Sequence, residues 1–210
     1  MPISLRACLV VTFLGVLAHG AEVTSTASAQ QAAAPDAKNL VLQRSDVPPG
    51  FPRTEARYTS NARLARRNKI PLSKVESWGR ISGYTVSYER PVSDLAVPST
   101  RGPIAIISTV SVHRAPGGAH AAFLWGSSAF LRQGSGSLKK TSIDAQLGDE
   151  SGVFTGTVTQ GKFLFRLFIV EWRENRSLAV ATTLGVDGKL KVQGVLALAR
   201  RQQIYLRKVR

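Results

Sequence analysis

The sequence predicts an α+β fold: a largely antiparallel sheet of about five strands with helices packed on it. Three observations lead to this prediction. Several stretches alternate with period two and are rich in β-branched residues, as strands are. Residues 116–133 begin at a proline and continue with apolar residues at helical spacing. The last third contains successive strand patterns separated by short turns, and helices set apart from such a sheet are typical of the α+β class.

Two short helices are predicted ahead of the first strand. Residues Asn61–Asn68 suit a helix with Asn61 as its cap, and Pro71 interrupts it because proline lacks a backbone N–H. A second short helix is expected over residues 73–78. The predicted element order is then α-α-β-β-α-β-β-β-α.

Two strands and a longer helix follow. Residues 81–90 alternate large apolar side chains with small or polar ones, the pattern of a half-covered strand. Residues 104–113 are rich in β-branched residues and predict a second strand. Pro116 then suits the first turn of a helix that ends near Gln133.

The last third predicts an antiparallel meander and a terminal helix. Strands are expected near 152–159, over 162–173 and over 177–184, with a tight turn at 174–176. Both faces of the long strand are apolar, so we expect it to be central and covered on both sides. The terminal helix has a basic face and an opposite apolar face, formed by Val192, Val195, Leu196, Ala199 and Leu206.

The N-terminal segment predicts export. Residues 7–18 form an apolar run of the length of a signal-peptide core, whereas a bilayer span needs about 20 apolar residues. Residues 1–29 are therefore expected to be a cleaved secretory signal, and small residues allow cleavage after Gly20 or after Ala29. Residues 30–37 resemble a flexible leader, and 38–210 a single domain without a transmembrane anchor.

Processing at either position removes the only cysteine, Cys8. It lies near the start of the apolar run, where it is not placed for lipid modification. The mature chain therefore has neither a disulfide nor a cysteine nucleophile, and its stability must come from its core.

The formal net charge is +15, and removal of residues 1–29 takes away one basic and one acidic residue, Arg6 and Glu22, so the excess stays in the domain. Such an excess predicts attraction to anionic polymers or lipid head groups. A solubilising surface without a dedicated partner is an equal alternative. Sequence-specific nucleic-acid binding is not expected. The densest basic groups are Arg63, Arg66, Arg67 and Lys69, and Arg200, Arg201, Arg207, Lys208 and Arg210.

Catalytic and metal-binding patterns are scarce. His113 and His120 are spaced by seven residues, which matches no metal motif, and both are expected to be surface or helix-start residues. Asp149 and Glu150 are adjacent, whereas a glycosidase needs two facing carboxyls, so turn capping is preferred over a hydrolase. Ser127 has no recognisable catalytic partner. We expect no catalytic residue, metal or cofactor.

Arg166 is the most informative single residue, because it is a lone cation in an otherwise apolar strand. A buried guanidinium must pair with an acid of the protein or with an anionic ligand group. The candidate acids are Glu89, Asp149, Glu150 and Glu171. If it binds a ligand, the candidate pocket residues are Arg166, Phe168, Trp172, Tyr84, Tyr88 and Trp125.

A second candidate surface consists of small or polar residues in neighbouring strands. They either line a shallow concavity or form a solvated sheet face. These residues are Thr85, Ser87, Thr109, Ser111, Ala181 and Thr183.

Five short motifs carry a family resemblance. They are SDVPPGF at 45–51, WGRISGY at 78–84, HAAF at 120–123, LGDE at 147–150 and LARRQ at 198–202. Their order and spacing resemble an uncharacterised family of exported bacterial proteins of the actinobacterial type. The layout is also loosely similar to the extracellular sensor domains of mycobacterial serine/threonine kinases, in which a sheet and helices form a ligand cleft. Those domains are associated with disulfides, which this mature chain lacks, so the cleft is not carried over.

These observations favour an exported, non-enzymatic binding or sensor-like protein of the envelope or the extracellular space. Its expected partner is a small molecule or an anionic ligand of the envelope. The alternative is a basic protein that adheres to anionic polymers or lipids, and a hydrolase is third.

Overall fold

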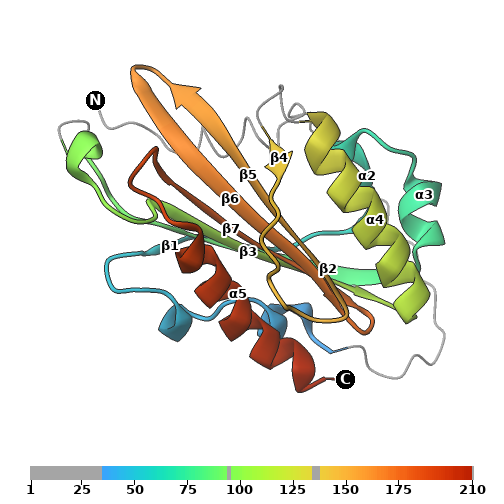
Figure 1. The fold of residues 1–210 in the computed structure, drawn as a ribbon. Helices are drawn as coiled ribbons and strands as arrows, with labels where there is room; N and C mark the ends of the chain where they lie inside the picture. The colour runs from blue at the N-terminus through green and yellow to red at the C-terminus, as the bar shows by residue number, and fades with distance from the viewer. Residues whose placement is uncertain (1–34, 94–95, 134–137, 210) are drawn as a thin grey trace, which may run out of the picture.

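Seven antiparallel strands form one sheet in the order β1-β2-β3-β7-β6-β5-β4 (Figure 1). The computed structural model describes residues 35–93, 96–133 and 138–209, so the predicted signal segment lies outside the described residues. The strands are β1 Arg53–Tyr58, β2 Arg80–Glu89, β3 Ala105–His113, β4 Lys139–Lys140, β5 Glu150–Gln160, β6 Phe163–Glu174 and β7 Ser177–Val186.

Helices precede, interrupt and end this sheet. Short 3-10 helices are η1 Ala37–Leu40, η2 Arg44–Asp46 and η3 Val97–Ser99, and the α-helices are α2 Asn61–Asn68, α3 Leu72–Ser77, α4 Pro116–Gln133 and α5 Val192–Arg207. The cap of α2 is Ser60, whose hydroxyl accepts from the Arg63 N–H, and not Asn61 as predicted.

The α+β class and the antiparallel sheet are confirmed, but the number of strands was wrong. β1 was missed because its sequence, Arg-Thr-Glu-Ala-Arg-Tyr, has no apolar alternation, as is common in a strand at the edge of a sheet. β4 has only two residues and carries no periodic signal. The predicted order is otherwise present, with one strand added before the first two α-helices and one after α4.

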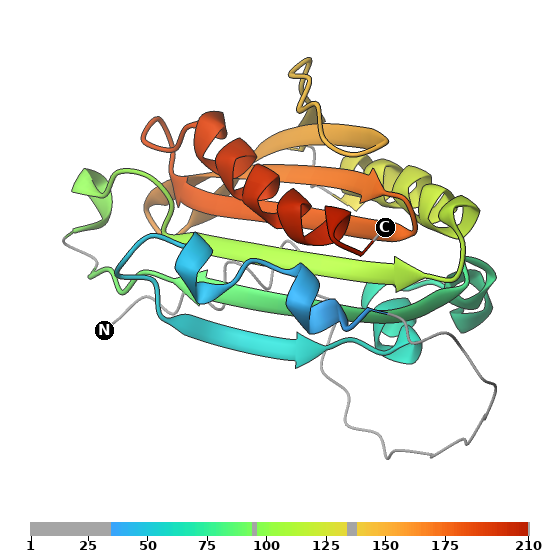
Figure 2. The same ribbon diagram turned by 90° about the horizontal axis from the view of Figure 1, so that it is seen from below.

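The helices lie on two opposite faces of the sheet (Figures 1 and 2). We call the side with α5, η1 and η2 the α5 face; its core includes Tyr84, Val86, Val110, Val170 and Trp172. The other side, the α4 face, packs against α2, α3 and α4, with cores around Trp78 and around Ile169.

Buried hydrogen bonds fix α5 and the N-terminal segment to the same central strand. The Ser108 hydroxyl accepts from the Leu42 N–H at 3.0 Å and donates to Gln202 Oε1 at 2.8 Å. The Tyr88 hydroxyl donates to the Leu42 carbonyl at 3.0 Å. Because a buried polar group costs free energy unless it is hydrogen-bonded, these contacts select one docking position for both elements.

His113 is a buried residue of the α4 face, which corrects the prediction that it lies at the surface. It is 0% exposed, and its Nδ1 lies 3.0 Å from the Trp78 carbonyl. Burial lowers its pKa to about 4, so the imidazole is neutral and its Nδ1–H donates to that carbonyl. His113 thus connects the end of β3 to the residue that follows α3.

None of the helices in the described part of the chain is long and apolar enough to span a membrane.

Candidate functional site

β6 is a central strand whose two faces are covered to different extents. On the α4 face its residues are buried along most of the strand. On the α5 face, burial changes along the strand: Leu164 is 45% exposed, Phe168 is half-buried, and Val170 and Trp172 are 0% exposed. We call the accessible stretch of this face, on β6 and beside it, the open end. It consists of Thr157, Leu164, Arg166, Phe168 and Asp187.

Arg166 forms an ion pair with Asp187 at the open end. Both Nε and Nη2 lie 2.7 Å from the same carboxylate oxygen, and about a third of each side chain is exposed. None of the four predicted acids is its partner. The β6–β7 hairpin pairs Arg166 with Gly185, which puts Asp187 diagonally beside it on the same face. The predicted strand stopped at residue 184, and this early end concealed the partner.

Phe168 lies between two threonines of the flanking strands. β5 places Thr155 and β7 places Thr183 directly opposite Phe168, so all three side chains are on the α5 face. The hydroxyls of both threonines are buried and have no hydrogen-bond partner among the described residues. Each such hydroxyl carries a desolvation cost of about 1–3 kcal/mol. The open end therefore adjoins two unsatisfied polar groups.

The other predicted pocket residues lie apart from this surface. Trp172, Tyr84 and Tyr88 share the α5 face with Arg166, but they are buried in the core beneath α5 and the N-terminal segment. Trp125 is on α4, on the opposite side of the sheet, where its ring lies 5.3 Å from that of Trp78. Of the six predicted residues, Arg166 and Phe168 are the ones that lie at the open end; Trp125 is also partly exposed, but on the opposite face of the sheet.

The predicted surface of small and polar residues divides between the two faces. Thr85, Ser87, Thr109 and Ser111 lie on the α4 face. Ala181 pairs with Ser108, and Thr183 pairs with Ile106, which puts both on the α5 face. The prediction that the six share one surface was wrong.

The α4 face contains a buried acid, Glu171, which is hydrogen-bonded to a neutral side chain. Its Oε2 accepts from the Ser127 hydroxyl at 2.8 Å, which supplies the partner that sequence reasoning did not find for this serine. Glu171 is 2% exposed, and burial raises its pKa to about 8. It is therefore mostly protonated at neutral pH.

Arg80 is a buried cation on the same face. Its guanidinium donates to the Ser111 hydroxyl, the Thr59 carbonyl and the Asn61 side-chain oxygen, at 3.0, 2.9 and 2.8 Å. Burial lowers its pKa to about 10. Through these hydrogen bonds Arg80 holds the start of β2 to Thr59 and to the first residue of α2, Asn61.

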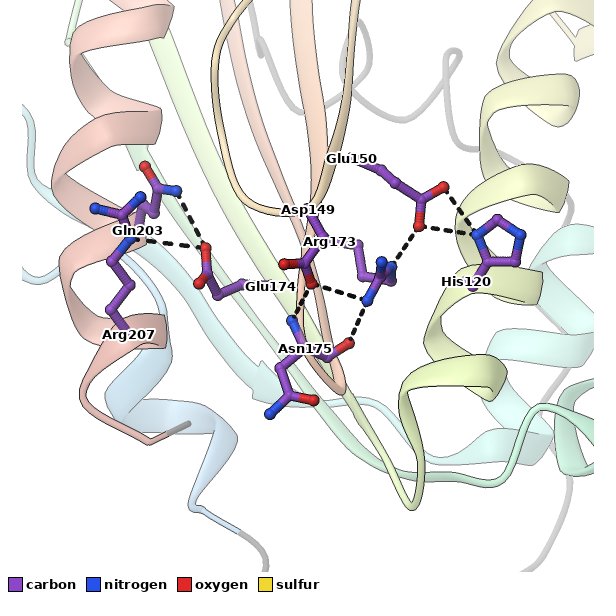
Figure 3. A network of polar contacts seen from close by, with 8 residues as sticks. All are labelled: His120, Asp149, Glu150, Arg173, Glu174, Asn175, Gln203 and Arg207. Atoms are coloured by element: carbon purple, nitrogen blue, oxygen red, sulfur yellow. Dashed lines mark hydrogen bonds and ion pairs between the residues drawn. The ribbon is translucent and has the colours of Figure 1, made fainter.

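Asp149 and Glu150 belong to an ion-pair network at the end of the β6–β7 hairpin (Figure 3). Arg173 binds both carboxylates, and His120 Nδ1 lies 2.8 Å from both oxygens of Glu150. The Asp149 carboxylate also accepts from the Asn175 N–H at 2.7 Å, as a turn cap does. Burial raises the pKa of Glu150, but its bonds to Arg173 and His120 outweigh this and hold it below its usual value.

The network joins three elements and presents no pair of facing free carboxyls. Next to it, Glu174 accepts from Gln203 of α5 at 3.1 Å and lies 3.8 Å from Arg207. The described residues contain no group of three or more His, Cys, Asp or Glu side chains that is arranged to hold a metal ion. The geometry of this region fits a structural clamp between the sheet and helices α4 and α5.

Comparison with known proteins gives a likeness of fold. No family model and no curated protein sequence matches the chain. Among solved structures, it is similar to the extracellular domain of PknH from Mycobacterium tuberculosis, with a TM-score of 0.59 at 8% sequence identity. The match covers 85% of this chain and 98% of that domain. The predicted likeness to the extracellular domains of mycobacterial kinases is thus confirmed for the fold.

Proposed function

We propose that the chain is an exported, non-enzymatic binding protein of the sensor type, whose ligand surface is the open end of the α5 face. The fold likeness to an extracellular kinase domain supports the sensor-like role, and the apolar segment at residues 7–18 supports export. N-terminal sequencing of the secreted protein tests the export step. It is expected to give Ala21 or Gln30 as the first residue.

The observation that carries the ligand surface is the accessible stretch of β6. On the α4 face β6 is buried along most of its length, whereas its α5 face is accessible from Leu164 to Phe168. At the open end an aromatic ring, an aliphatic side chain and an ion pair are all accessible together. Accessible residues on a sheet are well placed to bind a ligand, because the hydrogen bonds between the strands fix their positions.

A thermal-shift experiment on the mature domain tests this proposal. The probes are maltose, glucose 1-phosphate, a neutral dipeptide and dextran sulfate, each at low and high salt. At least one small probe should raise the unfolding temperature of the wild type and of the control Leu124→Ala, because a ligand that binds only the folded state stabilises it. Leu124 is an exposed leucine on α4, away from the open end.

The same probe should have little effect on Phe168→Ala or Arg166→Gln. A shift that persists in both variants, or no shift with any small probe, would overturn the proposed ligand surface.

The second candidate function is adhesion to anionic polymers or lipids, favoured by the exposed cations of α5 and its C-cap, Arg200, Arg201, Arg207 and Lys208. On this hypothesis dextran sulfate binds at low salt and is released at high salt, because screening weakens contacts between exposed charges. Binding would also be unaffected by Phe168→Ala.

A further inference from the structure

The groups at the open end select a ligand by charge. Arg166 carries a positive charge, and Asp187 neutralises it through two contacts of 2.7 Å to one oxygen. An anion that approached Arg166 would meet the Asp187 carboxylate, and a cation that approached Asp187 would meet the guanidinium. The pair therefore favours a neutral ligand over either ion.

The same groups provide both donors and acceptors at close range. The guanidinium has N–H groups beyond those bound to Asp187, the second carboxylate oxygen can accept, and the Thr157 hydroxyl can do either. Thr157 lies directly opposite Arg166 on β5, on the same face. A ligand hydroxyl, which both donates and accepts, is complementary to such a mixed set.

Apolar surface lies beside these polar groups. The half-buried Phe168 ring follows Arg166 along the α5 face of β6, and the exposed Leu164 precedes it. A sugar ring has hydroxyls at its edge and C–H groups on its faces, so it would bury its C–H face on Phe168. Burial of this apolar surface would contribute to the affinity.

The unsatisfied threonines give a second, independent indication. Thr155 and Thr183 flank Phe168 with buried hydroxyls that lack partners among the described residues. A shift of the Phe168 ring would let ligand hydroxyls reach them. The gain is larger for a ligand with several hydroxyls than for one with a single polar group.

We propose that the open end binds a neutral, polyhydroxylated ligand, a sugar or short oligosaccharide, through Arg166, Asp187, Thr157 and Phe168. This inference rests on the proposed function, because it assigns a ligand class to the same surface.

Isothermal titration of the mature domain with maltose and with glucose 1-phosphate tests the ligand class. The wild type and Leu124→Ala should bind maltose equally and more tightly than glucose 1-phosphate. Phe168→Ala and Asp187→Asn should each weaken maltose binding by roughly tenfold, the effect of about 1.4 kcal/mol. Asp187→Asn should at the same time improve the relative binding of glucose 1-phosphate, since Arg166 is then no longer neutralised.

The outcomes separate the two proposals. If glucose 1-phosphate or the dipeptide binds in a Phe168-dependent manner and maltose does not, the neutral-sugar class is wrong and the ligand surface stands. If none of these probes depends on Phe168 or Arg166, both proposals are wrong. Circular dichroism of each variant establishes that it is folded. Arg166→Gln replaces Phe168→Ala in the titration if the latter does not fold.

Discussion

An arginine and a glutamate of β6 lie five positions apart, on opposite faces of the sheet, and differ in exposure and in the kind of partner they have. Arg166 is partly exposed and has a carboxylate partner, Asp187. Glu171 is buried and accepts a hydrogen bond from the hydroxyl of Ser127. Arg166 lies at an accessible surface beside its counter-ion. Glu171 is buried without a counter-ion among the described residues, and burial keeps it mostly protonated at neutral pH, so that it affects stability instead.

Substitutions at the two ends of β6, on its α5 face, should differ most in their effect on the free energy of unfolding. Trp172→Ala should lower the free energy of unfolding by about 3–5 kcal/mol, because Trp172 is fully buried. Leu164→Ala at the open end should change it by less than about 1 kcal/mol. Chemical denaturation of both variants measures the difference. Similar losses in the two variants would show that the open end is covered in solution.

The second effect is a pH dependence that comes from Glu171. Its folded-state pKa of about 8 exceeds the ordinary glutamate value of 4.5, so its contribution to stability is fully present below about pH 4.5 and is lost as the pH rises through about 8. Between about pH 6.5 and about pH 8.5 the free energy of unfolding should fall by roughly 2 kcal/mol. His113 stays neutral in this range and does not mask the effect.

Glu171→Gln should abolish most of this slope, because the amide remains neutral and can keep the bond to Ser127. Denaturation of the two proteins at several pH values gives the comparison. If the two slopes are equal, Glu171 is already ionised in the folded state.

The third effect tests how closely α4 approaches Glu171. A Cβ at Gly126 would clash with a carboxylate oxygen of Glu171. Gly126→Ala should therefore destabilise by roughly 1–2 kcal/mol, since the acid or the helix must shift. In α5, a Cβ at Gly194 would meet nothing within 4 Å, so Gly194→Ala should stabilise by about 0.4–1 kcal/mol. Thermal unfolding compares them, and a neutral Gly126→Ala would argue against close packing of α4.

The smallest effect concerns the ion pair at the open end. Asp187→Asn should change the free energy of unfolding by no more than about 0.5 kcal/mol, because a pair this exposed is screened by solvent. Its effect on ligand binding should be much larger than its effect on stability. A loss of stability above about 2 kcal/mol would make the pair a structural element rather than a recognition element.

Most helices and strands could be predicted from the sequence, because the residue patterns that indicate them are local. Pro116 marked the start of α4, and the turn around Asn175 marked the β6–β7 hairpin. β1 was not predictable in this way, since its alternation is charged and polar and its pairing with β2 depends on a distant strand. Local patterns predict helices and central strands well, and edge strands poorly.

The candidate site was only partly predictable, for a reason of register. Parity along one strand identified Arg166 and Phe168 as neighbours on one face. The face of Thr183 was predicted wrongly, because alternation within a strand does not reveal which residues of two neighbouring strands lie opposite each other. In the structure Thr183 pairs with Phe168 and therefore shares its face. Burial beneath α5 could not be read from sequence either, so Trp172, Tyr84 and Tyr88 looked like pocket residues although they pack in the core.

The central claim is that ligand binds at the open end and not at the buried end of β6. The most direct test is an NMR titration of the ¹⁵N-labelled mature domain with maltose. The proposal predicts saturable shifts of the backbone amides of Thr157, Arg166, Phe168 and Asp187, with the amides of Ser127 and Glu171 unchanged. Shifts confined to α5 and α2, or to the residues around Glu171, would contradict it.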